Sequence, residues 1–478
     1  MAALVKGMKM EDKVFLYALE KKTALIEKLK KLVSCPSVGA DPKMFQGMES
    51  ARKYIETWLD EMGFKNLRRL EASKGSGQPV IYAERLDAPK KPTIIVYAHY
   101  DVQPPDPLDK WQTPPFEVTE KKDRLYGRGI SDDKGPMMIA LETISAFIKV
   151  EGKLPFNLKL IIEGEEETGS PSLPIILEKY SSLLSADAVL SADGARWRHD
   201  LVALNVGSRG NAGFQMKLTT ASKDLHSGRY GGIVANALHE MAKLISSLHN
   251  HEGRIMIPGF YDSVLPITRS QKDEISLIPN KDQLLKDLEA IPFGEKNFSS
   301  LENLWYRPSL DVNGMWGGYT GEGSKTVIAN EAYAKITMRL VDKQDPEETQ
   351  NLVINYLKSK IPAGSKLVIS DQRGSSGAYT VPENHPLLKA ASNALEATTG
   401  QQPFKVRIGA SLPLTEIVHR ILGIDTVMFS FALSDENFHA PNEFFRKSSI
   451  TDGLKAWVKI FREIQNTDIN DYTPYRLK

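Results

Sequence analysis

The sequence predicts an α/β fold in two domains: one built on a mostly parallel sheet, and a smaller α+β domain inserted into it. The 478 residues exceed what a single hydrophobic core usually supports. Short, continuous apolar runs such as "PTIIVYA" (92–98) are typical of strands that are buried on both faces. These runs alternate with helical patterns, as they do in parallel α/β sheets.

The first domain is expected to contain the chain's apolar strands and amphipathic helices. Its predicted strands are the segments 79–86, 92–98, 158–164, 187–193 and 425–433. Its predicted helices, where apolar residues recur at spacings of three and four, are 11–33, 48–64 and 132–150. Pro136 suits the first turn of the last of these helices.

The middle of the chain has the pattern of a separate α+β module. Its predicted strands are 213–222, 331–341 and 365–372, and its predicted helices are 234–250 and 345–361. Asp345 suits the N-cap of the second helix, with Pro346 next and Glu348 three residues on. We therefore expect one domain over 1–206 and 376–478, and an inserted domain over 207–375.

Composition excludes several classes of protein. The 61 basic residues balance 60 acidic ones and form no basic block, so no nucleic-acid partner is expected. No apolar run approaches the roughly 20 residues of a membrane span, so no membrane partner is expected. The N-terminus lacks the apolar core of a secretory signal, and the single cysteine, Cys35, fits a reducing compartment. The sequence thus predicts a soluble, cytoplasmic protein.

Acidic residues and histidines follow the predicted strands at the point where each strand ends. They are His99 and Asp101, the glutamates Glu165, Glu166 and Glu167, Asp193, and His439, with Asp132 and Asp133 placed just before a helix. Sites in open α/β sheets form beyond the carboxyl ends of the strands, so these side chains are expected to converge. Two histidines with several carboxylates suit zinc, manganese or cobalt, and the abundance of carboxylates suggests two ions.

Each of these signals has an ordinary structural explanation. A histidine after a strand is more often a hydrogen-bonding residue than a ligand, and paired aspartates before a helix are usually caps. A run of three glutamates is most often a solvated loop. The prediction of a metal site depends on their joint occurrence at strand ends.

Nine motifs resemble those of a known family. They are "HYDVQP" (99–104), "LYGRGISDDKGP" (125–136), "EGEEETGS" (163–170), "SADG" (191–194), "DLHSGRYGG" (224–232), "KTVIAN" (325–330), "RLVDKQDP" (339–346), "RIGASLP" (407–413) and "HAPNE" (439–443). In type and order they resemble the motifs of the di-zinc aminopeptidase, carboxypeptidase and aminoacylase superfamily. Within that superfamily the chain resembles the cytosolic non-specific dipeptidases, which are similar to carnosinase, and it looks like a bacterial-type relative of them. The resemblance implies a di-metal hydrolase domain with an inserted lid and dimerisation domain.

The resemblance also implies two divalent metal ions per subunit, zinc or alternatively manganese. His99 and Asp193 would bind one ion. Glu167 and His439 would bind the other, and Asp132 would bridge both.

Further roles follow from the same resemblance. The peptide bond between Asp132 and Asp133 would be cis, and Asp101 would orient the ring of His99. Glu166 would be the general base that takes a proton from a metal-bridged water and later protonates the leaving amine. The assignment of Glu166 comes from the motif, since the residues alone do not separate the three glutamates.

The resemblance places the substrate-binding residues mainly in the inserted domain. In a homodimer His226 would reach the partner's active site and stabilise the oxyanion. Arg339 would pair with the free C-terminal carboxylate of a small peptide substrate. Thr326, Ser411 and His439 would add further substrate contacts.

The implied activity is hydrolysis of the peptide bond in dipeptides and other small unblocked peptides. Two segments depart from the animal dipeptidases near the expected substrate pocket: "GASLP" has Ala410 in place of a second glycine, and "SDENFHAPNE" precedes and includes His439. One alternative is an amidohydrolase of the same superfamily that removes an acyl or succinyl group from an amino acid. Another is an inactive dimeric scaffold, which would need neither Glu166 nor the metal ligands.

Overall fold

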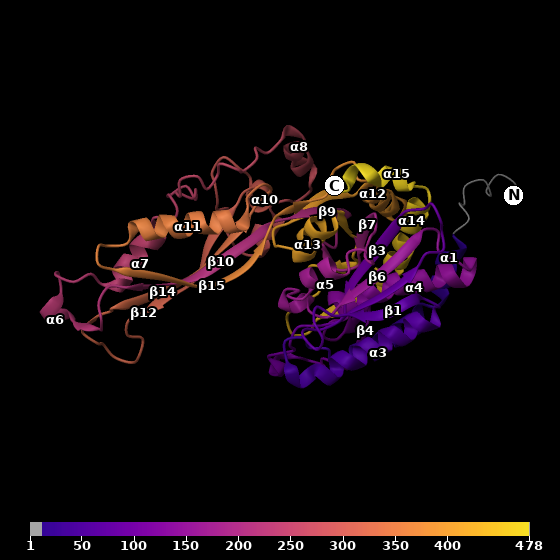
Figure 1. Cartoon of the computed structure of the whole chain (residues 1–478), viewed down its shortest axis with the longest axis horizontal. Coiled ribbons are helices and arrows are strands. Elements are labelled where there is room, and N and C mark those ends of the chain that lie inside the picture. The colour runs from indigo at the N-terminus through magenta and orange to yellow at the C-terminus, as the bar shows by residue number, and fades with distance from the viewer. Residues whose placement is uncertain (1–11, 478) are drawn as a thin grey trace. The chain divides into compact units, whose positions relative to one another are not determined.

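The computed structural model describes residues 12–477, and the chain divides into two compact units (Figure 1). The first unit comprises the residues up to Val206 together with Val381–Val406 and Ile417–Lys478. The second unit comprises Gly207–Thr380 and Arg407–Glu416. The segments 376–380 and 407–416 therefore group with the second unit, whereas we expected them in the metal-binding domain. Within residues 12–477 no helix has both the length and the hydrophobicity to span a bilayer.

The first unit is built on a six-stranded sheet with the order β1-β2-β6-β3-β7-β18. Its strands are β1 (Lys65–Leu70), β2 (Val80–Arg85), β3 (Thr93–His99), β6 (Asn157–Glu163), β7 (Ala188–Ser191) and β18 (Thr426–Met428). The strands β6, β3, β7 and β18 are parallel, whereas β2 runs antiparallel to both of its neighbours, β6 and the edge strand β1. The prediction of a mostly parallel sheet is confirmed.

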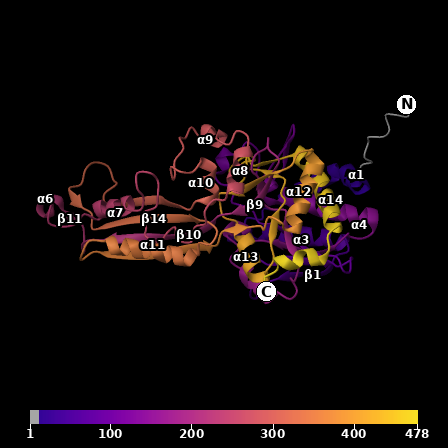
Figure 2. The same cartoon turned by 90° about the horizontal axis from the view of Figure 1, so that it is seen from above.

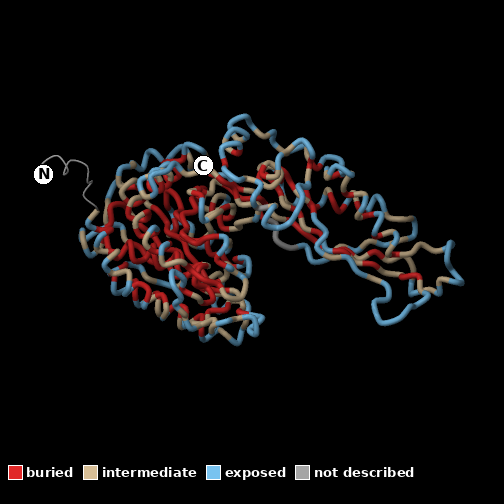
Figure 3. Tube along the Cα trace, turned by 180° about the vertical axis from the view of Figure 1, so that it is seen from behind, coloured by how far each residue is buried: buried red, intermediate tan, exposed pale blue. Residues whose placement is uncertain are grey.

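The central strands of this sheet are buried along nearly their whole length (Figure 3). The helices of the unit are α1 (Lys13–Glu20), α2 (Lys22–Val33), α3 (Phe45–Glu61), α4 (Gly135–Glu151), α5 (Leu173–Lys179), α12 (Pro386–Thr399), α14 (Lys447–Gln465) and α15 (Ile469–Tyr472). The helix α4 packs against α1 and α14, and it is buried from Gly135 to Phe147. That burial explains why its sequence is apolar on all sides.

Shorter elements complete this part of the chain. They are the helical turns η1 (Pro42–Met44), η2 (Leu108–Lys110), η3 (Ile130–Lys134), η4 (Glu166–Thr168) and η5 (Thr473–Tyr475), and the strands β4 (Thr119–Lys121), β5 (Arg124–Tyr126), β8 (Ala195–Arg196), β19 (Ala432–Leu433) and β20 (Phe444–Arg446). The strands β9 (Ala203–Ser208), β16 (Tyr379–Thr380) and β17 (Phe404–Ile408) lie where the chain passes from one unit to the other. The strand β20 pairs with β5, which in turn pairs with β4.

Two predicted elements are interrupted in the structure. The helix expected over 11–33 is broken at Lys21 into α1 and α2. The spacing of apolar residues continues across Lys21, so the sequence pattern does not reveal the break. The strand expected over 425–433 is divided into β18 of the main sheet and β19, which pairs with β8. Both halves are buried, so an unbroken apolar run cannot reveal that they join different sheets.

The second unit contains a four-stranded antiparallel sheet with the order β12-β14-β10-β15. Its strands are β10 (Gly210–Thr219), β12 (Ser309–Gly317), β14 (Glu331–Leu340) and β15 (Lys366–Ser376). Alternate residues of β10 and β14 pack against α7 (Ala237–Ser246) and α11 (Pro346–Lys360), both of which lie over the sheet in Figure 2. As expected, Asp345 caps α11 by accepting a hydrogen bond from the N–H of Glu348 at 2.8 Å.

The other elements of this region are short. The strands β11 (Leu225–His226) and β13 (Val327–Ile328) form a two-stranded ribbon. The helices are α6 (Ser227–Tyr230), α8 (Arg269–Leu277), α9 (Gln283–Asp287) and α10 (Ser300–Tyr306). The helix α13 (Pro413–Leu422) begins in the segment 407–416 and continues into the first unit. In both Figure 1 and Figure 2, α6 lies at one end of the second unit.

Candidate metal centre

Three neighbouring parallel strands deliver acidic and histidine side chains to one edge of the main sheet. His99 is the last residue of β3, Glu166 and Glu167 follow β6, and Asp193 lies two residues beyond β7. These strands are adjacent in the order β6-β3-β7 and run in the same direction, so their carboxyl ends meet. Asp132 comes from the turn η3, and it has the non-helical angles φ −126° and ψ 94°.

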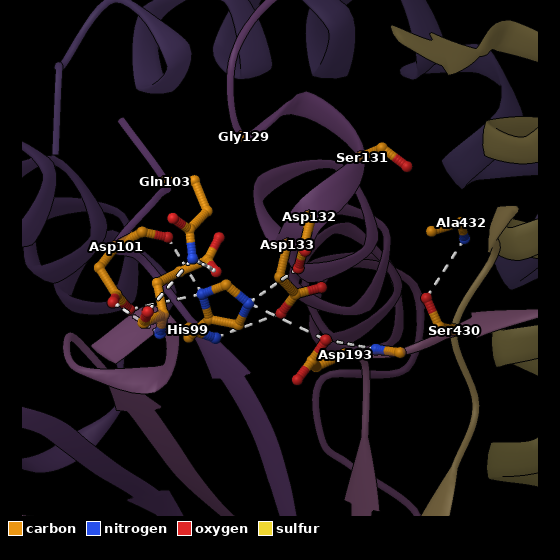
Figure 4. A network of polar contacts seen from close by, with 12 residues as sticks. His99, Asp101, Gln103, Gly129, Ser131, Asp132, Asp133, Asp193, Ser430 and Ala432 are labelled. Carbon is orange, nitrogen blue, oxygen red and sulfur yellow. Dashed lines mark hydrogen bonds and ion pairs between the residues drawn. The ribbon is translucent and has the colours of Figure 1, made fainter. Parts of the chain in front are cut away.

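The first group of potential ligands comprises His99, Asp132 and Asp193 (Figure 4). Nε2 of His99 lies 3.1 Å from Oδ1 of Asp132 and 3.9 Å from Oδ1 of Asp193. Nδ1 of the fully buried His99 ring donates a hydrogen bond to the backbone carbonyl of Asp101 at 3.0 Å. In the neutral ring this bond places the proton on Nδ1 and leaves the lone pair of Nε2 facing the two carboxylates.

The second group comprises Asp132, Glu167 and His439. Nε2 of His439 lies 3.1 Å from Oδ2 of Asp132 and 3.0 Å from Oε2 of Glu167. Asp132 thus offers one oxygen to each histidine and belongs to both groups. His439 is the most exposed member, and it lies in a loop with a positive φ of 62°.

Electrostatics at this site favour added positive charge. Burial raises the pKa of Asp193 to about 6, and burial together with Asp193 raises the pKa of Glu166. Hydrogen bonds to Asp132 and Glu167 raise the pKa of His439 to about 10. Although burial opposes ionisation, His439 and His99 hold the pKa of Asp132 well below its usual range. Without an ion, the histidines would carry the positive charge that these carboxylates require.

The donor set of the two groups fits divalent ions of the zinc or manganese type. Together the groups contain two imidazole nitrogens and three carboxylates, and no thiolate. Such nitrogen and oxygen ligands suit Zn²⁺ and Mn²⁺. The sharing of Asp132 would let one carboxylate serve two ions.

The structure separates the three consecutive glutamates by their contacts. Glu165 accepts hydrogen bonds from the backbone N–H groups of Gln78 at 2.8 Å and Ser172 at 3.0 Å. Glu167 belongs to the second ligand group. Among the residues that the structure describes, none donates a hydrogen bond to the carboxyl group of Glu166, which feels the charges of Asp193 and His99. Of the three, only Glu166 is close to the ligand groups and has a carboxyl group that accepts no hydrogen bond from the described residues.

Asp101 connects the two ligand groups through its backbone and its side chain. Its Oδ1 lies 3.4 Å from Nδ1 of His99, farther than its own backbone carbonyl. Its Oδ2 accepts a hydrogen bond from the N–H of Glu167 at 3.1 Å. The backbone carbonyl of Asp101 is therefore its nearest contact with the ring of His99, and the role of Asp101 in orienting that ring stays a prediction.

Three further residues contact the ligands, and two of them, Gln103 and Glu443, were not singled out from the sequence. Gln103 donates a hydrogen bond to Oε2 of Glu167 at 2.8 Å, and Asp133 accepts one from the N–H of His99 at 3.2 Å. The peptide bond between Asp132 and Asp133 is cis, as the resemblance implied. Glu443 contacts the backbone of Asp132. All three lie inside the quoted motifs, so their position in a motif was the sequence signal that could have identified them.

The residues expected to bind substrate fall mainly in the second unit, where the structure brings them together in two pairs. Nη1 of Arg339, at the end of β14, donates a hydrogen bond to Oγ of Ser411 at 2.9 Å. His226 and Thr326 meet at the ribbon of β11 and β13, where the N–H of Ser227 donates to the carbonyl of Thr326 at 3.2 Å. The two pairs lie at opposite ends of β14, which begins five residues after Thr326 and contains Arg339 as its penultimate residue.

Comparison with known proteins identifies relatives over almost the whole chain. The pattern of Peptidase family M20/M25/M40 matches residues 95–463. Beta-Ala-His dipeptidase of Mus musculus is 30% identical over 470 residues, which cover 95% of each chain. The structure of the di-peptidase Dug1p from Saccharomyces cerevisiae is similar with a TM-score of 0.79 at 27% identity, covering 95% of this chain and 98% of that one. The M20 family metallo-carboxypeptidase Sso-CP2 from Sulfolobus solfataricus has a TM-score of 0.78 at 30% identity, covering 96% and 100%.

The matched region contains both groups of potential ligands, from His99 to His439. It also contains Glu166 and the pair formed by Arg339 and Ser411. The family pattern spans well over half of the chain, and it confirms the resemblance predicted from the motifs. The chain belongs to peptidase family M20/M25/M40.

Proposed function

We propose that this protein is a metal-dependent dipeptidase that hydrolyses the peptide bond of dipeptides and other small unblocked peptides. The observation that carries the proposal is the pair of ligand groups sharing Asp132, beside the unbonded carboxyl group of Glu166. The names of the mouse and yeast relatives, which are dipeptidases, support peptide-bond cleavage and do not favour a deacylase. The presence of every potential ligand argues against a scaffold.

The proposed site holds two divalent ions. His99 and Asp193 would hold one, Glu167 and His439 the other, with Asp132 shared. We propose zinc, with manganese as the alternative, because both ions accept imidazole and carboxylate ligands. When bound, the ions supply positive charge that makes water more acidic and polarises the substrate carbonyl.

Glu166 is the proposed general base. Its carboxylate would take a proton from the attacking water as the carbon–oxygen bond forms at the scissile carbonyl. It would then give that proton to the leaving nitrogen as the carbon–nitrogen bond breaks. Burial and the neighbouring Asp193 raise the pKa of Glu166. A higher carboxyl pKa makes the carboxylate a stronger proton acceptor.

Arg339 and Ser411 are the proposed binding groups for the substrate's C-terminal carboxylate. A guanidinium group can donate two parallel hydrogen bonds to a carboxylate. The bond between Arg339 and Oγ of Ser411 at 2.9 Å places a hydroxyl group next to that guanidinium. A free carboxylate on the substrate would therefore be recognised by charge and by geometry.

The separation of the two substrate-binding pairs supports a homodimer. Eight residue steps along β14, from Glu331 to Arg339, span about 26 Å. A dipeptide is only about 7 Å long. Arg339 and His226 of one subunit therefore cannot both contact the same dipeptide. We propose that His226 and Thr326 act on the substrate held by the partner subunit, where His226 would stabilise the oxyanion.

The edge strand β12 supports the same assembly. In the part of the chain that the structure describes, β12 pairs with β14 on one side only. Met315 and Trp316 on this strand are 50% and 41% exposed, and Tyr319 is exposed just beyond it. An exposed edge with large apolar side chains is suited to pairing with another chain. We propose this edge as part of the dimer interface.

The test of the proposed reaction compares free dipeptides with N-acyl amino acids. Protein reconstituted with Zn²⁺ or Mn²⁺ is assayed beside a chelated sample and beside Glu166→Gln, which reports any contaminating peptidase. Ion-dependent cleavage of free dipeptides alone is the expected result. Cleavage confined to N-acyl amino acids would move the chain to the deacylases, and activity on neither would favour a scaffold.

A further inference from the structure

The carboxylate of Glu443 lies buried among hydrogen-bond donors of the turn that carries Asp132. Its Oε1 accepts hydrogen bonds from the N–H groups of Ser131 at 2.8 Å and Asp132 at 3.2 Å. Its Oε2 accepts from the N–H of Gly129 and from Nη1 of Arg128, both at 2.8 Å. The residue is 1% exposed. One side chain thus accepts hydrogen bonds from three backbone N–H groups of this turn and from a buried guanidinium group.

These backbone groups have few alternatives for hydrogen bonding. Asp132 departs from helical geometry, so its N–H cannot join an ordinary helical ladder. The approach to the turn is also crowded, because a Cβ atom on Gly129 would lie 2.1 Å from Cγ1 of Val102. Buried N–H groups without an acceptor destabilise the folded state. Glu443 therefore supplies the hydrogen-bond acceptors that the N–H groups of this turn need.

Glu443 also belongs to the segment that carries the second histidine. It follows His439 by four residues and directly precedes β20, which pairs with β5. Its backbone carbonyl accepts a hydrogen bond from the N–H of Gly127 at 3.0 Å. Its backbone and side chain together join the loop of His439 to the turn of Asp132. Nε2 of His439 and Oδ2 of Asp132 lie 3.1 Å apart.

We infer that Glu443 is a positioning residue, whose carboxylate fixes Asp132 relative to His439 and so tunes ion binding by both groups that share Asp132. This inference rests on the proposed role of Asp132 in ion binding, and it does not depend on which substrate is cleaved. Residues that hold metal ligands in place commonly change metal affinity by about 10- to 100-fold when they are replaced.

Glu436 offers a matched control. It is also fully buried, and it lies in the same C-terminal segment and pairs with an arginine, Arg446, at 3.0 Å. Its side chain accepts hydrogen bonds from Oγ of Ser131 at 2.6 Å and from the N–H of Leu433 at 3.0 Å. It makes no described bond to Asp132. Replacing it removes a comparable buried carboxylate without removing the bond to the shared ligand.

The experiment compares Glu443→Gln with Glu436→Gln in the full chain. Calorimetric titration of the chelated proteins with Co²⁺ gives the ion affinity, thermal unfolding without ions gives stability, and kcat and KM are measured for a dipeptide. We expect Glu443→Gln to weaken Co²⁺ binding by about 10- to 100-fold and to lower kcat with little change in KM. Its amide would turn an N–H₂ group toward the donors of Gly129 and Arg128. Glu436→Gln should stay within about threefold of the original affinity.

Glu443→Asp provides a second variant that keeps the charge on a shorter side chain, and it should lose an intermediate amount of affinity. Unchanged Co²⁺ binding in a folded Glu443 variant, or equal losses in the Glu443 and Glu436 variants, would overturn the inference. Absence of Co²⁺ binding by the original protein would instead overturn the proposed ion site itself. Ion binding without dipeptide cleavage would overturn only the proposed reaction.

Discussion

Nε2 of His99 and Oδ1 of Asp132 lie 3.1 Å apart, although 33 residues separate them in the chain. The first residue ends a buried strand, and the second lies in a turn whose backbone is bonded to a distant carboxylate. A carboxylate held this close to an imidazole lone pair is suited to sharing a cation. The other oxygen of Asp132, Oδ2, lies at the same distance of 3.1 Å from Nε2 of His439.

Removal of divalent ions should destabilise the protein. Asp193 and Glu167 each have a carboxylate oxygen within 4.8 Å of one of Asp132, so bound cations relieve the repulsion between these carboxylates. An ion present at about 1,000 times its dissociation constant adds about 4 kcal/mol to the free energy of unfolding. We expect calorimetry to show a higher midpoint with Zn²⁺ or Mn²⁺ than with a chelator, and Mg²⁺ serves as the control. Identical midpoints under all conditions would contradict an ion site.

Glu166→Gln should abolish turnover while leaving ion binding intact. The carboxyl group of Glu166 makes no structural hydrogen bond within the described residues, so its loss should barely affect the fold. A general base contributes about 10²- to 10⁴-fold to the rate, and kcat should fall by that amount. Glu165→Gln is the matched control, because Glu165 holds the backbone of Gln78 and Ser172. Near-normal kcat in Glu166→Gln would refute its role as the base.

Arg339→Ala should mainly raise KM for substrates with a free C-terminal carboxylate. A hydrogen bond to a charged group is worth about 1.5–3 kcal/mol, which corresponds to roughly a 10- to 100-fold increase. Substrates with a C-terminal amide should be affected far less. Lys335→Ala is the control on the same strand, since Lys335 is exposed and precedes Arg339 by four residue steps, or about 13 Å. A KM that stays constant for free dipeptides would remove Arg339 from the binding pocket.

His226→Ala should be inactive alone and should regain activity when mixed with Glu166→Gln. A hybrid dimer contains one complete site, made from Glu166 of one subunit and His226 of the partner subunit. Random exchange would restore about a quarter of the original activity, because half of the dimers are hybrids with one working site. Subunit exchange is verified with two affinity tags. Exchange without any recovery would show that His226 does not act across the interface.

His385 should make stability depend on pH below neutrality. It is fully buried, and its Nδ1 caps α12 by accepting a hydrogen bond from the N–H of Leu387 at 3.2 Å. Burial lowers its pKa to about 4, although Asp425 acts in the opposite direction. The unfolded chain, with a histidine pKa of about 6.5, therefore takes up the proton first. The free energy of unfolding should fall as the pH drops from about 6.5 to about 4, by roughly 3 kcal/mol in total.

The measurement for His385 is urea unfolding of chelated protein between pH 7.5 and 4.5. His385→Asn keeps a capping acceptor that does not titrate, so its stability should change less over this range. The exposed His251→Asn serves as the control and should behave like the original protein. An identical pH dependence in His385→Asn and the original protein would rule out His385 as the source.

The sequence by itself determined the α/β class and the identities of the potential ligands. Buried parallel strands need continuous apolar runs, and these runs marked where β3, β6 and β7 end. Local spacing was also enough to predict the helix cap at Asp345. Motif resemblance then predicted the family, which the comparison confirmed.

Only the tertiary structure decided what each ligand touches. It distinguished Glu165 from Glu166 and Glu167, because the difference lies in their contacts with Gln78, Ser172 and His439, which the residue order alone does not specify. It also bonded Glu443 to the turn of Asp132 and fixed His99 through a backbone carbonyl. Residue type and local spacing govern strands, helices and caps, whereas hydrogen bonds between distant segments form only when the folded chain brings their atoms within about 3 Å.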